Sequence, residues 1–437
     1  MNGAPDLLVT NGIVMTMDPT GLVIADGAVT VSGDTITGVG PASALAAAPA
    51  KAIIDAGGGI IMPGLVNTHT HVAMTLFRGL ADDLPLMTWL NDHIFPAEAL
   101  LDPDKVHTGA LLGCAEMILS GTTCFCDMYL FEAAVARAAR AAGMRALVGE
   151  VLYDFPSPNY GPIEKGLSYT RRLIDTWRGD GLVTIAVEPH SPYLCAPDLL
   201  IEAAEIAREH NLALVMHLSE TQAEVRDIQN RYGTTPVGHL ANLGLLDRNL
   251  LACHCVVLSP TDMELLQRYA VNVSHNPESN MKLASGVCPV PDLIERGICV
   301  GLGTDGCCSN NNLDLFTEMD MAAKLHKVSR LDPTVMDAAA VLRMATIEGA
   351  RALGLDHRCG SLEIGKRADI IVIDTRKPHL TPLYHPESHL VYAVSGSDVC
   401  ATVVNGRVLM KDRQLLHLDL EKIMADARQT AAAIRSR

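Results

Sequence analysis

The chain has 437 residues, of which 49% are hydrophobic and 19% are charged, a composition that indicates a large buried interior and argues against long disordered tails. Its formal net charge of −16 disfavours nucleic acid and anionic membrane surfaces as partners, because their phosphates would be repelled. The first residues lack the layout of a signal peptide, and no apolar run approaches the roughly 20 residues that span a bilayer. These features predict a compact cytoplasmic protein.

The two ends of the chain share a pattern of short strands separated by turns. The strand-like segments are LLVTNGIVMTMD, LVIADGAVTVSG and DTITGVG near the N-terminus, and ADIIVID and ATVVNGRVLM near the C-terminus. We therefore expect residues 1–62 and 362–437 to build one small β-sandwich together. A helical pattern from Asp419 onward is expected to close the chain.

Residues 63–361 alternate short apolar runs with longer amphipathic segments such as APDLLIEAAEIAREH. Alternating strands and helices imply a parallel sheet with right-handed crossovers. The apolar runs are GLVNTHTH, TTCFCDM, ALVGEVLY, VTIAVEPH, LALVMHL, LLACHCVV, AVNVSHN and CVGLGTD, about as many as the eight strands of a closed (β/α)8 barrel. The predicted fold is therefore an α/β protein, a (β/α)8 TIM barrel with the small β-sandwich attached.

The carboxyl ends of these predicted strands carry side chains of the types that bind metal ions. They are, in strand order, His69 and His71, His190, His217, His254 and Asp305. In a (β/α)8 barrel those ends converge on one face, where catalytic groups gather. Side chains two residues apart on a strand project to the same side, so His69 and His71 can hold one ion. A lone histidine at a strand end is more often structural, but the combined set predicts a metal site.

Several long motifs carry a resemblance to a known family. They are PGLVNTHTH, LADDLPLMTWL with PAEA after it, PHSPYLC, HLSET, HCV, SHNPESNMKL and GLGTDGCCSNNNLDLF. The chain resembles the amidohydrolase superfamily over nearly its whole length, and within it most closely the 5-methylthioadenosine/S-adenosylhomocysteine deaminases. Members of that family are metal-dependent enzymes, and related enzymes are usually homo-oligomers.

The resemblance implies that His69, His71, His217 and Asp305 bind one divalent metal ion, usually zinc. Neutral imidazoles and one carboxylate suit zinc and leave a coordination place for water. Relatives with two metal ions bridge them with a modified lysine on the fourth strand, and VTIAVEPH contains no lysine. The expected site therefore holds a single ion, which would lower the pKa of bound water to near 7 and supply hydroxide as the nucleophile.

The resemblance also assigns the remaining catalytic roles. Glu220 matches the family's proton-shuttling glutamate, which takes the water proton, delivers it to a ring nitrogen and then protonates the departing amine. His254 would position the hydroxide or polarise the attacked carbon. Asp305 would assist proton transfer as well as binding the metal. The alternative for Glu220 is a solvated glutamate at the start of a helix.

Substrate contacts are implied in the same way. Glu98 matches the acid that receives the ribose 2′- and 3′-hydroxyls, and His190 matches the residue that faces a purine ring nitrogen. Trp89 would supply apolar cover for the base or its 5′ group. Glu150 stands where relatives that accept S-adenosylhomocysteine can carry an arginine. A carboxylate there would repel the homocysteine carboxylate, which favours 5′-truncated adenosines as substrates.

The resulting prediction is a hydrolase that replaces the 6-amino group of an adenosine derivative by oxygen and releases ammonia. Candidate substrates are 5′-methylthioadenosine, S-adenosylhomocysteine, 5′-deoxyadenosine and adenosine. Three alternatives stay open at this point. One is a deaminase or chlorohydrolase of a free base or triazine, such as guanine, cytosine or an s-triazine; another is a non-catalytic scaffold with the amidohydrolase fold; the last is a barrel that binds a phosphorylated sugar.

Overall fold

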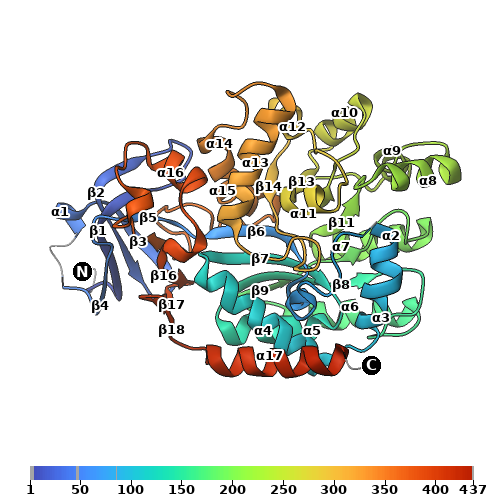
Figure 1. The fold of residues 1–437 in the computed structure, drawn as a ribbon, viewed down its shortest axis with the longest axis horizontal. Coiled ribbons are helices and arrows are strands. Elements are labelled where there is room, and N and C mark those ends of the chain that lie inside the picture. The colour runs from blue at the N-terminus through green and yellow to red at the C-terminus, as the bar shows by residue number, and fades with distance from the viewer. Residues whose placement is uncertain (1–3, 46–48, 85, 436–437) are drawn as a thin grey trace.

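The computed structural model describes residues 4–45, 49–84 and 86–435. Its centre is a curled parallel sheet whose strands match the eight apolar runs of the sequence (Figure 1). Two short segments, β9 and β10, together take the place of the fourth strand. The strands are β6 (Leu65–Thr70), β7 (Thr122–Tyr129), β8 (Arg145–Leu152), β9 (Val183–Ile185), β10 (Glu188–Pro189), β11 (Leu214–Leu218), β12 (Leu250–His254), β13 (Asn272–His275) and β14 (Val300–Leu302).

The strands of the barrel pair in chain order. Strands β6, β7 and β8 are parallel neighbours, and β9 and β10 both pair with β8. A bridge between Val187 and Leu214 joins this half to β11, which continues through β12 and β13 to β14. The last strand meets the first, because the backbone N–H of Asp305 donates to the carbonyl of His69 over 2.9 Å. The predicted TIM barrel is confirmed.

Helices surround this sheet (Figure 1), and their boundaries follow from local sequence. Helix α10, for example, is capped by the preceding residue Ser259, whose hydroxyl accepts from the backbone N–H of Asp262 while the Asp262 carboxylate accepts from the backbone N–H of Ser259. The helices that follow the barrel strands include α4 (Pro103–Leu119), α5 (Glu132–Ala142), α6 (Ile163–Trp177), α7 (Pro197–His210), α8 (Gln222–Tyr232), α9 (Pro236–Asn242), α10 (Pro260–Arg268), α11 (Pro277–Lys282), α12 (Val290–Glu295), α13 (Leu315–Arg330), α14 (Ala338–Met344) and α15 (Ile347–Ala352).

Both ends of the chain contribute to a second sheet, at the left of Figure 1. Its hydrogen bonds run through the order β18-β17-β16-β15-β5-β1-β2-β3, with β4 paired to β1. N-terminal β5 and C-terminal β15 are antiparallel neighbours, so the two ends depend on each other. These strands are β1 (Leu7–Met15), β2 (Val23–Ser32), β3 (Thr35–Pro41), β4 (Ala52–Asp55), β5 (Ile60–Pro63), β15 (Ile370–Ile373), β16 (Val399–Val404), β17 (Arg407–Lys411) and β18 (Gln414–Leu415).

This terminal sheet has a hydrophobic core of its own, in which Val9 and Val29 from one end pack with Ile370 and Val403 from the other. The expected module built from both termini is therefore confirmed, and its hydrogen bonding forms one continuous sheet of nine strands. The closing helix is also present, as α17 (Leu420–Arg435), which lies along α4 on the outside of the barrel (Figure 1). Among the described residues, no helix has the length and apolar character needed to cross a membrane.

Candidate metal centre and active-site pocket

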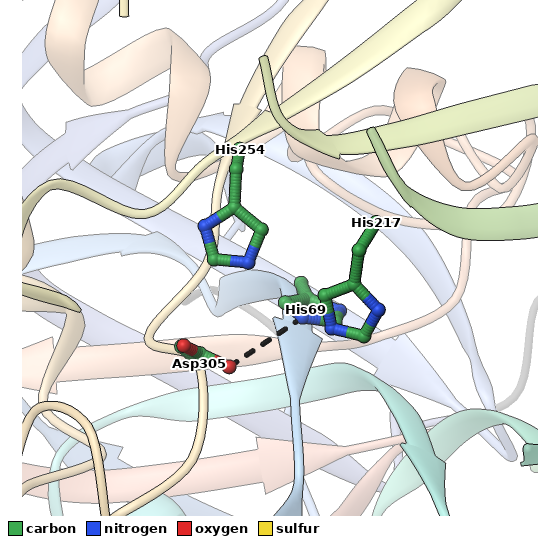
Figure 2. Close-up of side chains that lie close together, drawn as sticks. All are labelled: His69, His217, His254 and Asp305. Atoms are coloured by element: carbon green, nitrogen blue, oxygen red, sulfur yellow. Dashed lines mark ion pairs between the residues drawn. The ribbon is translucent and has the colours of Figure 1, made fainter. Parts of the chain in front are cut away.

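Four ligand-type side chains converge at the carboxyl ends of the barrel strands. His69 lies near the end of β6, His217 in β11, His254 at the end of β12, and Asp305 just after β14. Each offers one nitrogen or oxygen atom, these atoms all lie within 4.8 Å of one another, and all four residues are buried. Figure 2 shows the three imidazoles and the carboxylate gathered around one space. Imidazole and carboxylate are ligands that bind divalent metal ions.

His71 borders the same centre. Its Nε2 lies 3.0 Å from Asp305 Oδ1, and its ring centroid is 4.9 Å from that of His69. The other ring nitrogen, Nδ1, is hydrogen-bonded to the carbonyl of Met128. The compact group of four therefore contains His254, which we expected to act on the nucleophile, whereas His71, which we expected as a ligand, lies beside it. Both assignments stay predictions.

His69 tests whether a cation fits this site. Its side chain is fully buried, and neither ring nitrogen has a hydrogen-bond partner in the protein. A buried polar group without a partner is rare and calls for a ligand or ion. Burial lowers the pKa of His69 to about 4, so the imidazole is neutral and can donate a lone pair. A divalent metal ion satisfies these requirements, and the residues fit one.

The carboxylate of Asp305 is held in place by two serines. Its Oδ2 accepts from Ser279 Oγ at 2.6 Å and from Ser309 Oγ at 2.7 Å. Its Oδ1 is thereby turned toward His69, at 3.5 Å, and His71. Burial acts to raise the pKa of Asp305, but contacts with the two histidines outweigh it and keep the pKa well below its usual range. The group is therefore an anion, the form that binds a cation.

The backbone and neighbouring groups also orient the histidines. His217 Nδ1 lies 2.9 Å from the carbonyl of His190, and His254 Nδ1 lies 2.9 Å from Asn280 Oδ1. His254 and Asp305 both adopt positive φ angles, of 73° and 58°, a strained conformation that persists where the surroundings enforce it and is common at active sites. Our sequence reasoning did not find Ser279, Asn280 or Ser309, although all three lie in the motifs SHNPESNMKL and GLGTDGCCSNNNLDLF.

A pocket opens directly over this centre. His71, His217, His254 and Asp305 form its floor. The residues expected to act on a substrate also line it, namely Trp89, Glu98, His190 and Glu220. Its other walls are mainly apolar: Met74, Leu90, Ile94, Phe95, Met128, Tyr129, Leu130, Val151, Tyr153, Tyr193 and Leu283, with Ser309. Among the described residues that line it, none is a lysine or an arginine.

Glu220 is fixed in the turn that follows β11. The Glu224 carboxylate accepts from the backbone N–H groups of Ser219, at 2.8 Å, and Glu220, at 2.7 Å. This leaves the Glu220 side chain directed into the pocket with His254 nearby. Burial raises the pKa of Glu220 above its ordinary value, with His254 acting in the opposite sense. A carboxyl group with a raised pKa can accept and return a proton closer to neutral pH.

The remaining pocket residues differ in what they offer. Burial raises the pKa of Glu98 to about 7, and neighbouring Tyr129 partly opposes the shift. Burial lowers the pKa of His190 to about 3, so this ring is neutral, and its Nδ1 lies 2.9 Å from Ser191 Oγ. The Trp89 indole N–H donates to the carbonyl of Ala81 at 3.0 Å. Trp89 therefore presents an apolar surface to the pocket.

Glu150 requires a correction. The structure places it away from the pocket lining, with a fully buried carboxylate that accepts from the backbone N–H groups of Phe131 and Glu132 and from Asn159 Nδ2, at 3.3, 2.9 and 2.7 Å. Its neighbour Val151 lines the pocket instead, because successive side chains of a strand face opposite sides. Glu150 caps the N-terminus of α5 and is not positioned to repel a substrate carboxylate.

Comparisons with known proteins agree with this architecture. The Amidohydrolase family profile matches residues 60–409. A 5-methylthioadenosine/S-adenosylhomocysteine deaminase of Syntrophobacter fumaroxidans is 59% identical over 98% of both chains, and a 5′-deoxyadenosine deaminase of Methanosarcina mazei is 46% identical over 99% of both. The solved structure of an adenosine deaminase from Xanthomonas campestris with bound zinc superposes with a TM-score of 0.98, at 39% identity and over 100% of both chains. The chain belongs to the amidohydrolase family.

Proposed function

We propose that this protein hydrolyses the 6-amino group of adenosine derivatives to give the inosine derivative and ammonia. It is a hydrolase that acts on C–N bonds of cyclic amidines. The observation that carries this proposal is the joining, in one pocket, of a cluster of metal-ligand side chains, a buried glutamate and a second carboxylate suited to a ribose. The names of the full-length relatives, which refer to deaminases of 5′-modified adenosines, point to the same chemistry.

We propose zinc as the metal ion, one per subunit. The donor set of imidazole nitrogens and one carboxylate oxygen is the type that zinc prefers in catalytic sites, and the related adenosine deaminase binds zinc. The ligands we propose are His69, His71, His217 and Asp305, with His254 close enough to exchange roles with His71. When bound, such an ion makes a water molecule acidic enough to act as a nucleophile near neutral pH.

The remaining catalytic and substrate-binding roles fall to residues of the pocket. Glu220 accepts one proton of the attacking water and transfers it to a ring nitrogen, which its raised pKa favours. It then takes the second proton, from the hydroxyl added to the purine carbon, and delivers it to the leaving amine. His254 holds the attacking oxygen in line. His190, kept neutral by burial, faces a purine ring nitrogen. Trp89 covers the base, and Glu98 accepts the ribose hydroxyls.

The pocket lining favours substrates with an uncharged 5′ group. It contains Glu98, Glu220 and Asp305 but no described lysine or arginine that would pair with a carboxylate. A homocysteine carboxylate would therefore enter without a cationic partner, at a cost in binding free energy. We propose a preference for 5′-methylthioadenosine, 5′-deoxyadenosine or adenosine over S-adenosylhomocysteine. This argument now depends on the lining and not on Glu150.

A single assay tests the activity and its competitors. Ammonia release is measured with metal-replete protein and with 5′-methylthioadenosine, 5′-deoxyadenosine, adenosine, S-adenosylhomocysteine, adenine, guanine and cytosine. We expect the highest kcat/KM with one of the first three. Activity on free bases alone would remove the role of Glu98, and release from none of these compounds would refute the proposed function. A strong preference for S-adenosylhomocysteine would overturn the specificity argument while leaving the deaminase activity intact.

A further inference from the structure

A large cavity lies on the face of the barrel opposite the catalytic pocket. Its volume is about 920 Å³, and its walls include Asn249, Asn272 and Val300, at the amino ends of β12, β13 and β14. A second cavity, of about 340 Å³, adjoins it and shares Arg248 and Arg351 as lining residues. The catalytic pocket lies at the carboxyl ends of the strands and has no lining residue in common with either.

The two cavities are rich in arginine, although the chain carries a net charge of −16. Five arginines line them, against two carboxylates: Arg248, Arg296, Arg343, Arg351 and Arg358, with Glu348 and Asp356. Glu348 accepts from both Arg343 and Arg351, each at 2.8 Å. Within the described residues, the guanidinium groups of Arg248, Arg296 and Arg358 make no hydrogen bond or ion pair; Arg248 lines both cavities, Arg296 the larger one and Arg358 the smaller one.

We infer that the larger cavity binds a phosphorylated small molecule. A guanidinium group presents paired N–H donors that match the oxygens of a phosphate, and the two unpaired groups that line the larger cavity, those of Arg248 and Arg296, favour a multiply charged anion. The size also fits, because cavities that bind small ligands measure about 300–1,000 Å³. Val271, Ile294 and Met344 add apolar wall to the larger cavity, which an organic group would contact and a bare phosphate would not. The ligand class is therefore a phosphate ester.

Isothermal titration calorimetry on the full-length, metal-loaded protein tests the site without reference to turnover. The probes are uridine 5′-monophosphate and fructose 1,6-bisphosphate as phosphate esters, uridine as the uncharged match, and inorganic phosphate. We expect at least one ester to bind with a dissociation constant below about 1 mM, more tightly than inorganic phosphate, and uridine not to bind. If inorganic phosphate binds as tightly as the esters, the assignment of the ligand as a phosphate ester is overturned. If no anion binds with a dissociation constant below about 1 mM, the proposed site itself is refuted.

Charge reversal locates the binding. Arg248→Glu and Arg296→Glu should each weaken binding at least about tenfold, because each removes a cationic partner and adds a repulsive charge. Arg428→Glu, on the exposed outer surface of α17, makes the same change in net charge and should leave the dissociation constant within about twofold, since exposed charges at this distance are screened. Equal affinity in all three variants would place the anion outside the cavity and contradict the inference. Deaminase activity plays no part in this readout, so failure of the proposed function would leave it unaffected.

Discussion

Two regions of this molecule bury polar side chains in opposite ways. At the carboxyl ends of the barrel strands, both ring nitrogens of His69 are buried without a hydrogen bond, and the nearest carboxylate oxygen, Asp305 Oδ1, lies 3.5 Å from Nε2. At the junction between the barrel and the terminal sheet, Arg145 and Asp369 are equally buried, but Arg145 Nε and Nη2 donate to Asp369 at 2.8 and 3.2 Å, and the Asn405 backbone N–H donates to the same carboxylate at 2.7 Å. Buried nitrogens that make no hydrogen bond leave room for a ligand, whereas fully hydrogen-bonded charges hold two parts of the fold together.

The first prediction concerns chemistry without loss of structure. Glu220→Gln keeps the shape of the side chain but removes its ability to carry a proton. We expect kcat to fall by about 10²- to 10⁴-fold, with metal content and thermal stability unchanged. Steady-state kinetics and elemental analysis of the same sample measure both. Glu205→Gln, exposed on α7, is the matched control, and a Glu220→Gln protein with full kcat would exclude Glu220 from the mechanism.

The second prediction concerns loss of stability without loss of chemistry, at the junction between the barrel and the terminal sheet. Arg145→Met leaves the Asp369 carboxylate buried without its cation, and we expect the free energy of unfolding to drop by about 3–5 kcal/mol. Urea denaturation measures this loss, and kcat of the folded fraction should not change. The exposed pair of Arg171 and Glu209 provides the control, since Arg171→Met should cost less than about 1 kcal/mol.

The double variant Arg145→Met with Asp369→Leu sharpens this test. It removes both charges, so it should be more stable than Arg145→Met alone, because no uncompensated carboxylate remains. If the double variant were less stable than the single one, the loss would come from packing and not from the unpaired charge.

The contrast also shows which features the sequence could predict. The eight apolar runs and the polar residues at their ends were enough to predict the barrel and the residues that meet at its rim, because the carboxyl ends of barrel strands converge. The direction of Glu150 was not predictable from its position alone. Strand alternation places Glu150 and Val151 on opposite faces, but only the packing of α5 against β8 decides which of them faces the pocket.

Two further features depend on contacts between distant segments. Ser279 and Ser309 both donate to Asp305, yet nothing in their sequence spacing predicts that their hydroxyls meet at one carboxylate. The arginines of the opposite cavity are distributed between residues 248 and 358, with no period that a helix or strand pattern would show. Hydrophobic periodicity predicts the elements, but it does not report which polar side chains converge across loops.

The third prediction tests the serines as positioning residues. Ser279→Ala and Ser309→Ala each remove one hydrogen bond from Asp305 Oδ2, and loss of such an outer contact typically weakens metal affinity about 10- to 100-fold. Competition with a metal chelator measures this affinity. Ser168 is the control, because its hydroxyl is exposed on α6 and donates to the Glu164 carbonyl, so Ser168→Ala should leave the metal affinity unchanged. If Ser279→Ala and Ser309→Ala also leave the metal affinity unchanged, the two serines do not position Asp305.

The smallest expected effect is a pH dependence of substrate binding through Glu98. Burial raises the pKa of this carboxyl from 4.5 to about 7, so it is ionised above that pH and protonated below it. An ionised carboxylate is the stronger acceptor for ribose hydroxyls. KM for 5′-deoxyadenosine should therefore rise about three- to tenfold as the pH falls through 7 and stay level above it. Glu98→Gln, which cannot ionise, should show a raised KM that does not vary with pH. Because Glu220 affects kcat, pH profiles of KM and of kcat measured separately distinguish Glu98 from Glu220. If KM of the unsubstituted protein does not change with pH, Glu98 does not bind the ribose as an anion.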